Sequence, residues 1–294
     1  MYSEIEANKR KTVFLILFFI AFIGGLAYLA GLYFNDFAIT IGALIGSTIY
    51  AVFSYFASAK VALSFNGAHE IQKHDNPRLW RTVENLAITE GMPMPKVHII
   101  EDRAFNAFAT GRDPNHAHVA ITSGLLEALE DSELQGVMAH EIGHIKNYDI
   151  RVSMIVFGLV MIVSILADLF LRMSLFGSRN RDDNSSAGSI IAIAAIVAMI
   201  ISPIVAVMIQ SAISRKREYL ADASGALTTR YPEGLARALE KIQAGGSTIK
   251  RQNTSTAHLF FANPLKSKGM SAMFSTHPPI EDRIARLRSM GSKV

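Results

Sequence analysis

The sequence contains no cysteine, one tryptophan, and no charged residue in two long stretches near its N-terminus. Without cysteine the chain forms no disulfide and offers no thiolate to a metal, so any metal site must use histidine and carboxylate ligands. Its basic residues form small clusters beside apolar runs and make no basic stripe with interleaved aromatic residues. We therefore expect no nucleic-acid partner.

Long apolar runs are what the chain has in abundance, since 50% of its residues are hydrophobic. Residues 13–34 and 37–59 carry no charge, and each run can cross roughly 30 Å of hydrocarbon as a helix. Because Asn35 and Asp36 alone separate them, they predict a tight membrane hairpin. A cleaved signal peptide fits less well, because the first run is too long and a second follows at once.

A second pair of apolar runs, residues 152–171 and 190–209, predicts another hairpin. A buried pair of helices is the alternative for these two weaker runs. We therefore expect four parts: an N-terminal transmembrane hairpin (1–59), a catalytic domain (60–150), a second transmembrane hairpin (151–213) and the C-terminal part of the catalytic domain (214–294).

Within residues 60–150, Asn76-Pro77 predicts the start of a helix, with Asn as the N-cap and Pro in the first turn. Short strands are expected at residues 96–101, 104–110 and 117–122. Ser132 and Gln135 have the spacing of a capping box that opens the next helix. After residue 214 the pattern predicts a charged helix, a second helix from near Pro232, and a terminal amphipathic helix. That last helix carries Ile280, Ile284 and Leu287 on one face.

The helix that follows Gln135 contains His140-Glu141-Ile142-Gly143-His144, an HExxH pattern. Residues four apart lie on one face of a helix, so both imidazoles can bind one metal ion. Glu141 projects beside them, where it can act as a general base toward water. An ordinary helix with two surface histidines is the alternative.

A catalytic zinc site needs a third protein ligand, and Glu218 is the best candidate. Asp222 lies one helical turn further on, where it can accept a hydrogen bond from a ligating histidine and fix its tautomer. From spacing alone, a solvated helix face beside a membrane explains Glu218 and Asp222 equally well.

The topology favours the zinc site. Two apolar runs separate His144 from Glu218, and two crossings return the chain to the same side of the membrane. The basic clusters at residues 9–11 and 215–217 mark that side as cytoplasmic, whereas the arginines in and beside residues 172–183 oppose this assignment. We expect a multi-pass protein of the cell membrane whose catalytic domain faces the cytoplasm.

These features resemble the HtpX-type membrane metalloproteases, relatives of the CAAX prenyl protease. The resemblance covers nearly the whole chain: both hairpins, the HEIGH motif, the Glu-x-x-Ala-Asp segment at 218–222, Asn106-Ala107-Phe108, and His277-Pro278-Pro279 followed by Arg283.

The resemblance implies one Zn²⁺ per chain, with Glu218 as its third ligand. It also implies that Asn106, Ala107 and Phe108 form an edge along which an extended substrate pairs. His277 and Arg283 would lie near the metal, and His277 could help to stabilise the oxyanion.

The expected fold is mainly α: a four-helix transmembrane part plus a zincin-like α+β catalytic domain with a small β-sheet. The expected function is a zinc endopeptidase that cleaves membrane or misfolded proteins, which the resemblance links to quality control; regulatory membrane partners are left open. The nearest alternative has the same chemistry on prenylated C-terminal peptides, although the CAAX enzymes have longer chains with more spans.

Other classes fit less well. A non-catalytic membrane scaffold has no need of Glu141, and a transporter would need charged or broken helices at the membrane midplane. A non-haem iron oxygenase could use two histidines and a carboxylate. The glutamate adjacent to the ligands, and ligands on two helices, fit hydrolysis better.

Overall fold

A computed structural model describes residues 2–176, 215–245 and 278–291. The chain begins with a hairpin of two long helices, α1 (Tyr2–Phe34) and α2 (Phe37–Phe65). Asn35 turns the chain with a positive φ of 52°, and the Asp36 side chain caps α2 by accepting a hydrogen bond from the Ala38 N–H. The expected helical hairpin is therefore present, with the expected two residues between its arms.

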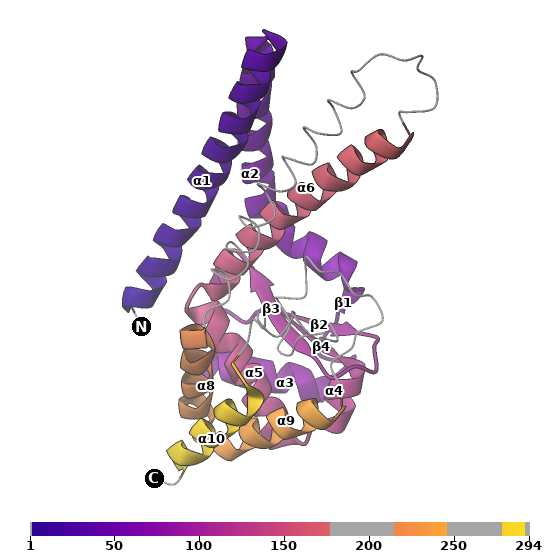
Figure 1. Ribbon diagram of the computed structural model, residues 1–294. Helices are drawn as coiled ribbons and strands as arrows, with labels where there is room; N and C mark the ends of the chain where they lie inside the picture. The colour runs from indigo at the N-terminus through magenta and orange to yellow at the C-terminus, as the bar shows by residue number, and fades with distance from the viewer. Residues whose placement is uncertain (1, 177–214, 246–277, 292–294) are drawn as a thin grey trace.

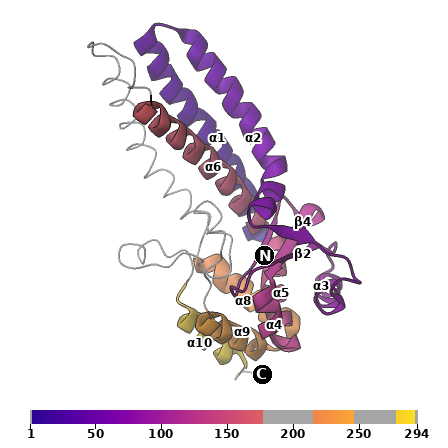
Figure 2. The same cartoon turned by 90° about the vertical axis from the view of Figure 1, so that its right-hand side faces the viewer.

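A third long helix, α6 (Asp149–Phe176), packs against both arms of this hairpin. All three helices project from one end of the molecule (Figures 1 and 2). Within the described residues, one helical segment, Thr40–Phe65, is long and apolar enough to cross a membrane. The apolar run at residues 190–209 lies outside the described residues.

A four-stranded mixed sheet lies next to the helical projection, with strand order β1-β2-β4-β3. The strands are β1 (Ala68–Glu70), β2 (Lys96–Ile100), β3 (Ala107–Gly111) and β4 (Ala117–Thr122). β2 and β4 are parallel, and the two outer strands pair antiparallel with them. Three strands were expected from the sequence; the short β1 was not.

Glycine is required where β3 ends. Gly111 has φ of +141°, and a Cβ atom there would lie 2.4 Å from the His116 carbonyl oxygen. The chain then passes through a 3-10 turn, η1 (Pro114–His116), into β4. This tight return pairs β3 antiparallel with β4, and β3 lies at the edge of the sheet.

Helices cover both faces of the sheet. One face, with Val97, Val119 and Ile121, belongs to the main hydrophobic core together with residues of α3 (Pro77–Thr89) and α5 (Asp131–Lys146). The opposite face packs Phe108 and Ala120 against Leu63, near the end of α2. The helical hairpin is thus anchored directly on the sheet.

The other helices in the described part of the chain are α4 (Ser123–Ala128), α8 (Arg215–Thr229), α9 (Pro232–Gly245) and α10 (Ile280–Gly291). Asn76 caps α3 as expected, accepting a hydrogen bond from the Leu79 N–H at 2.9 Å. The prediction that Ser132 and Gln135 form the capping box of α5 is wrong. The helix begins at Asp131, and the Glu133 carboxylate accepts a hydrogen bond from the Glu130 N–H at 2.7 Å.

Candidate metal centre

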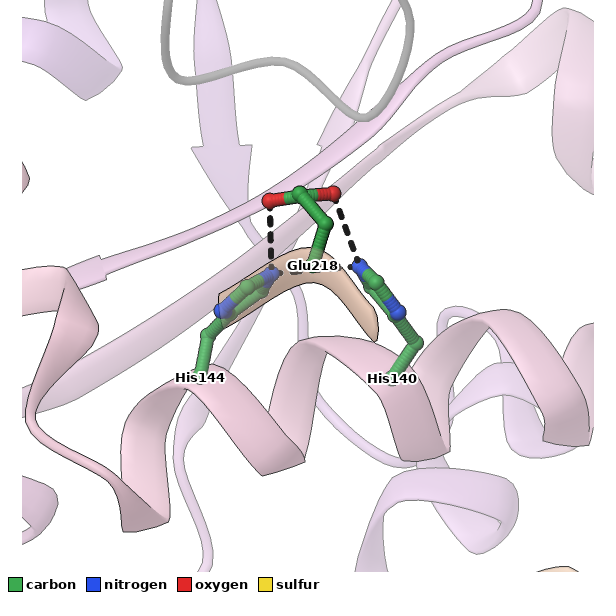
Figure 3. A group of neighbouring side chains, drawn as sticks. All are labelled: His140, His144 and Glu218. Carbon is green, nitrogen blue, oxygen red and sulfur yellow. Dashed lines mark hydrogen bonds and ion pairs between the residues drawn. The ribbon is translucent and has the colours of Figure 1, made fainter. Parts of the chain in front are cut away.

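Helix α5 runs through the interior and is buried along most of its length. It packs against α3, α8 and α9 and beside strand β3. Gly136 allows the close crossing with α9, since a Cβ atom there would lie 2.7 Å from the Leu235 nitrogen. His140 and His144, four residues apart, consequently project from one face of a firmly held helix (Figure 3).

Helix α8 crosses α5 through small residues. A Cβ atom on Gly225 would lie 3.1 Å from the His140 backbone nitrogen, and one on Gly143 would lie 3.6 Å from the Ala221 Cα. This close approach brings Glu218, one turn before Ala221, over the two imidazole rings. Its carboxylate faces both of them in Figure 3.

The three side chains form a compact group of possible metal ligands, with ligand atoms within 4.8 Å of one another. The two Nε2 atoms are 3.1 Å apart, and the Glu218 oxygens lie 3.8 Å from His140 Nε2 and 3.5 Å from His144 Nε2. In a tetrahedral zinc site with metal–ligand bonds of about 2.1 Å, ligand atoms lie about 3.4 Å apart. The observed separations fit that size.

Each imidazole is oriented by a carboxylate on its Nδ1 side. His140 Nδ1 lies 3.0 Å from Asp222, and His144 Nδ1 lies 2.9 Å from Asp149. A proton on each Nδ1 directs the Nε2 electron pair toward the common point, which is the arrangement of histidine ligands in zinc proteins. Asp222 therefore lies where the spacing placed it.

Asp149 was missed in the sequence. It follows the end of α5, five residues after His144, and begins α6. The available signal was a carboxylate shortly before an apolar run and five residues after the second metal-ligating histidine. Its Oδ1 also lies 3.6 Å from an Arg217 nitrogen.

Arg283 reaches the site from α10, and its side chain is only 1% exposed. It forms a two-pronged pair with Asp222, with distances of 2.9 and 2.7 Å. Another of its nitrogens lies 3.6 Å from a Glu218 oxygen. The guanidinium thus lies between two buried carboxylates of α8, one of them a metal-ligand candidate.

Burial and charge set the protonation of the imidazoles. Burial lowers the pKa of His140 to about 4, against the opposing effect of Asp222. Burial also disfavours charged His144, but Asp149 and Glu218 outweigh it and raise the pKa to about 9. The metal-free group therefore keeps a proton on His144, and a divalent cation can supply that positive charge instead.

Glu141 is buried beside the ligands, and burial raises its pKa to about 7. A backbone hydrogen bond from Ala109 of β3 opposes this shift. A carboxyl group with a pKa near neutrality can both accept and return a proton. Its position fits the expected base.

The expected substrate-binding residues lie at the start of a strand beside the metal centre. Asn106, Ala107 and Phe108 lie at and just before the start of β3, the edge strand beside α5, and their side chains are buried. His277 lies outside the described residues.

Comparison with known proteins agrees with this site. The family model described as Peptidase family M48 matches residues 73–291. A Protease HtpX homolog from Tropheryma whipplei (strain Twist) is 51% identical over 293 residues, covering 100% of this chain and 99% of that protein. Another from Dictyoglomus turgidum is 44% identical, covering 99% of this chain and 95% of that protein.

The fold resembles the crystal structure of S. mikatae Ste24p, with a TM-score of 0.53 and 19% identity over 98% of this chain and 67% of that one. At this identity the likeness concerns the fold alone. The sequence matches confirm the expected HtpX-type resemblance and the zincin-like catalytic domain. The chain therefore belongs to peptidase family M48, and it is an HtpX-type zinc metallopeptidase.

Proposed function

We propose that this peptidase cleaves peptide bonds of membrane or misfolded proteins at the cytoplasmic face of the cell membrane, as a quality-control enzyme. One Zn²⁺ per chain would be held by His140, His144 and Glu218. The observation that carries the proposal is the convergence of two Nδ1-anchored imidazoles and one carboxylate on a single point, with Glu141 beside them.

When bound, zinc polarises a peptide carbonyl and lowers the pKa of water, so that hydrolysis proceeds near neutral pH. The Glu141 carboxylate would take the proton from the attacking water and pass it to the leaving amine. Its raised pKa matches both roles. Asp222 and Arg283 would hold His140 and Glu218 in place, and His277 would help to stabilise the oxyanion.

Strand β3 offers the edge for an extended substrate. Thr122 donates its N–H to the Asn106 carbonyl at 2.9 Å, so Asn106 and Phe108 direct their main-chain groups toward β4. Ala107 and Ala109 then direct theirs away from the sheet, on the side where Ala109 meets Glu141. The Ala107 N–H already bonds to Asn106 Oδ1 and the Ala109 N–H to Glu141. A peptide strand added here would lie next to the base and would donate its main-chain N–H groups to the Ala107 and Ala109 carbonyls.

The membrane assignment draws support from the surface of the hairpin. Large apolar side chains stay more than half exposed along α2, recurring at Ile41, Ile45, Ile49 and Phe53. Such a continuous apolar stripe is typical of contact with lipid.

The charged N-terminal end of α1 contacts the start of α6, next to the metal centre. This contact supports placing the catalytic residues on the side of the basic cluster at residues 9–11, the cytoplasmic side. We extend the proposal to four spans, in which the N-terminal hairpin (1–59) and the segment 151–213 flank the first part of the catalytic domain (60–150). Residues 214–294 would complete that domain.

The test is proteolysis by the full-length protein in detergent, after zinc removal with a chelator and after zinc add-back. The parent should cleave an unfolded membrane-protein substrate only with zinc. Glu141→Gln should keep one zinc per chain and lose at least about a hundredfold in rate, because it removes the base. His140→Ala should lose the zinc itself, measured by elemental analysis.

Two results would contradict the proposal. The first is parental cleavage by the Glu141→Gln variant. The second is cleavage of a prenylated C-terminal peptide while the unfolded membrane protein stays intact, which would favour CAAX-type processing.

A further inference from the structure

The N-terminal helix contacts the carboxylate that orients His144. Asn8 of α1 is 5% exposed, and its amide nitrogen donates hydrogen bonds to Asp149 Oδ1 at 2.8 Å and to the Asn147 carbonyl at 2.9 Å. The other oxygen of Asp149 lies 2.9 Å from His144 Nδ1. A single carboxylate thus connects a residue near the start of the chain to a metal-ligating ring.

The two hydrogen bonds match the chemistry of the asparagine side chain. Its amide nitrogen carries two hydrogens, and each meets an acceptor. Asp149 is 5% exposed, so a buried carboxylate oxygen that loses a donor also loses part of what fixes its position. Arg217 lies 3.6 Å from the same oxygen, which leaves Asn8 as the shorter contact.

The turn that presents Asp149 is strained. Helix α5 ends at Lys146, and the capping residue Asn147 still donates its N–H to the Gly143 carbonyl. Tyr148 then adopts a positive φ of 61° before α6 begins. A non-glycine residue in this conformation stores strain that its surroundings must offset. Asn8 holds this turn on both sides of Tyr148, and the Lys9 ammonium lies 4.9 Å from the centre of the Tyr148 ring.

We propose that Asn8 is a positioning residue of the zinc site. Its amide fixes the Asp149 carboxylate and the turn at residues 147–149, and Asp149 in turn fixes the tautomer and direction of the His144 ring. The inference rests on the proposed zinc site. It makes α1 a part of the catalytic unit as well as an arm of the hairpin.

The test compares two isosteric changes on one helix, in the full-length protein in detergent. Asn8→Leu removes the amide, whereas Thr12→Val, one turn further along, removes a buried hydroxyl that, among the described residues, bonds within α1 to the Asn8 carbonyl. Zinc affinity is measured by competition with a chromophoric chelator. Loss of an outer hydrogen-bonding partner weakens metal binding, so Asn8→Leu should bind zinc about three- to tenfold more weakly. Thr12→Val should bind like the parent.

A double-mutant cycle with Asp149→Ala separates positioning from general damage to the fold. If Asn8 acts through Asp149, Asn8→Leu should have little further effect on zinc affinity once Asp149 is gone. Additive losses would overturn the inference. If Asn8→Leu does not express, Asn8→Ala, which also removes the amide but leaves a smaller side chain, replaces it under the same expectations.

The outcomes also separate this inference from the proposed function. If the parent binds one zinc that His140→Ala abolishes, yet Asn8→Leu binds zinc as tightly as the parent, the role of Asn8 is wrong and the site stands. If the parent binds no zinc that depends on His140, the proposed function fails first.

Discussion

Replacing Arg283 by methionine should strongly destabilise the metal-free protein. The guanidinium is 1% exposed and lies between the Asp222 and Glu218 carboxylates, which are themselves buried. Burial alone would raise the pKa of Asp222, but the charge of Arg283 and the hydrogen bonds from Arg283 and His140 together lower it and keep that carboxylate ionised. Methionine fills much of the volume but removes the positive charge between the two carboxylates, and Glu218 then keeps only the protonated His144 ring, 3.5 Å away.

The size of the effect follows from this geometry. Removing one partner of a buried ion pair costs about 3–5 kcal/mol, because the remaining charge stays in a poorly solvated place. For a domain of this size, 1 kcal/mol corresponds to about 2–4 °C in the unfolding midpoint. Arg283→Met should therefore lower the midpoint by about 6–20 °C.

Thermal unfolding of the metal-free, detergent-solubilised protein measures this shift. Arg288→Met is the matched control, because Arg288 lies on the same helix and pairs with Glu233 and Glu240 at the surface, where water screens the charges. Its midpoint should stay close to that of the parent. If the two variants shift by the same amount, Arg283 has no special role in holding the buried carboxylates.

Three further predictions concern the metal centre. Because metal-free His144 has a pKa of about 9, zinc must displace a proton from it, so zinc affinity should rise with pH up to about 9. Calorimetry at pH 7 in two buffers of different ionisation enthalpy should show that about one proton is released on zinc binding. If no proton is released, the prediction is refuted. Asp149→Asn keeps the shape of the side chain but weakens the hydrogen-bond acceptor for His144 Nδ1, so chelator competition should show about 10–100-fold weaker zinc binding. If the variant binds zinc as tightly as the parent, Asp149 does not orient His144. Gly225→Val should push α8 away from α5 and move Glu218, so zinc content should fall, whereas Gly291→Val, with open space around it, should keep it.

The sequence predicted the parts of the fold that depend on local patterns. Asn76 caps α3 because its side chain bonds to the first turn, and Asn35-Asp36 turns the hairpin because αL and capping conformations suit these residues. The three-residue strand β1 escaped prediction, because it is too short for an alternating pattern and exists through pairing with β2. The start of α5 was predicted wrongly because the capping box is formed by the acidic residues Glu130 and Glu133 and not by Ser132 and Gln135.

At the site, the HExxH spacing predicted that two imidazoles share one face, since this follows from helix geometry alone. The position of Glu218 required packing information: small residues at 221 and 225 let α8 approach α5, and such contacts have no local signature. Asp149 and Asn8 were missed for the same reason. Their contact joins residues far apart in sequence through a turn with a positive φ at Tyr148.

The contacts of the metal centre join distant stretches of the chain: Asn8 reaches Asp149, the two histidines follow in α5, Glu218 comes from α8, and Arg283 comes from α10. During synthesis the ligand set is therefore incomplete until α8 has emerged, and the Asp222 carboxylate lacks its Arg283 partner until α10 has followed. A nascent chain that already holds HExxH would stay inactive while its later helices are still in the ribosome. The order in which the helices are synthesised would thus prevent an incomplete chain from cleaving neighbouring polypeptides.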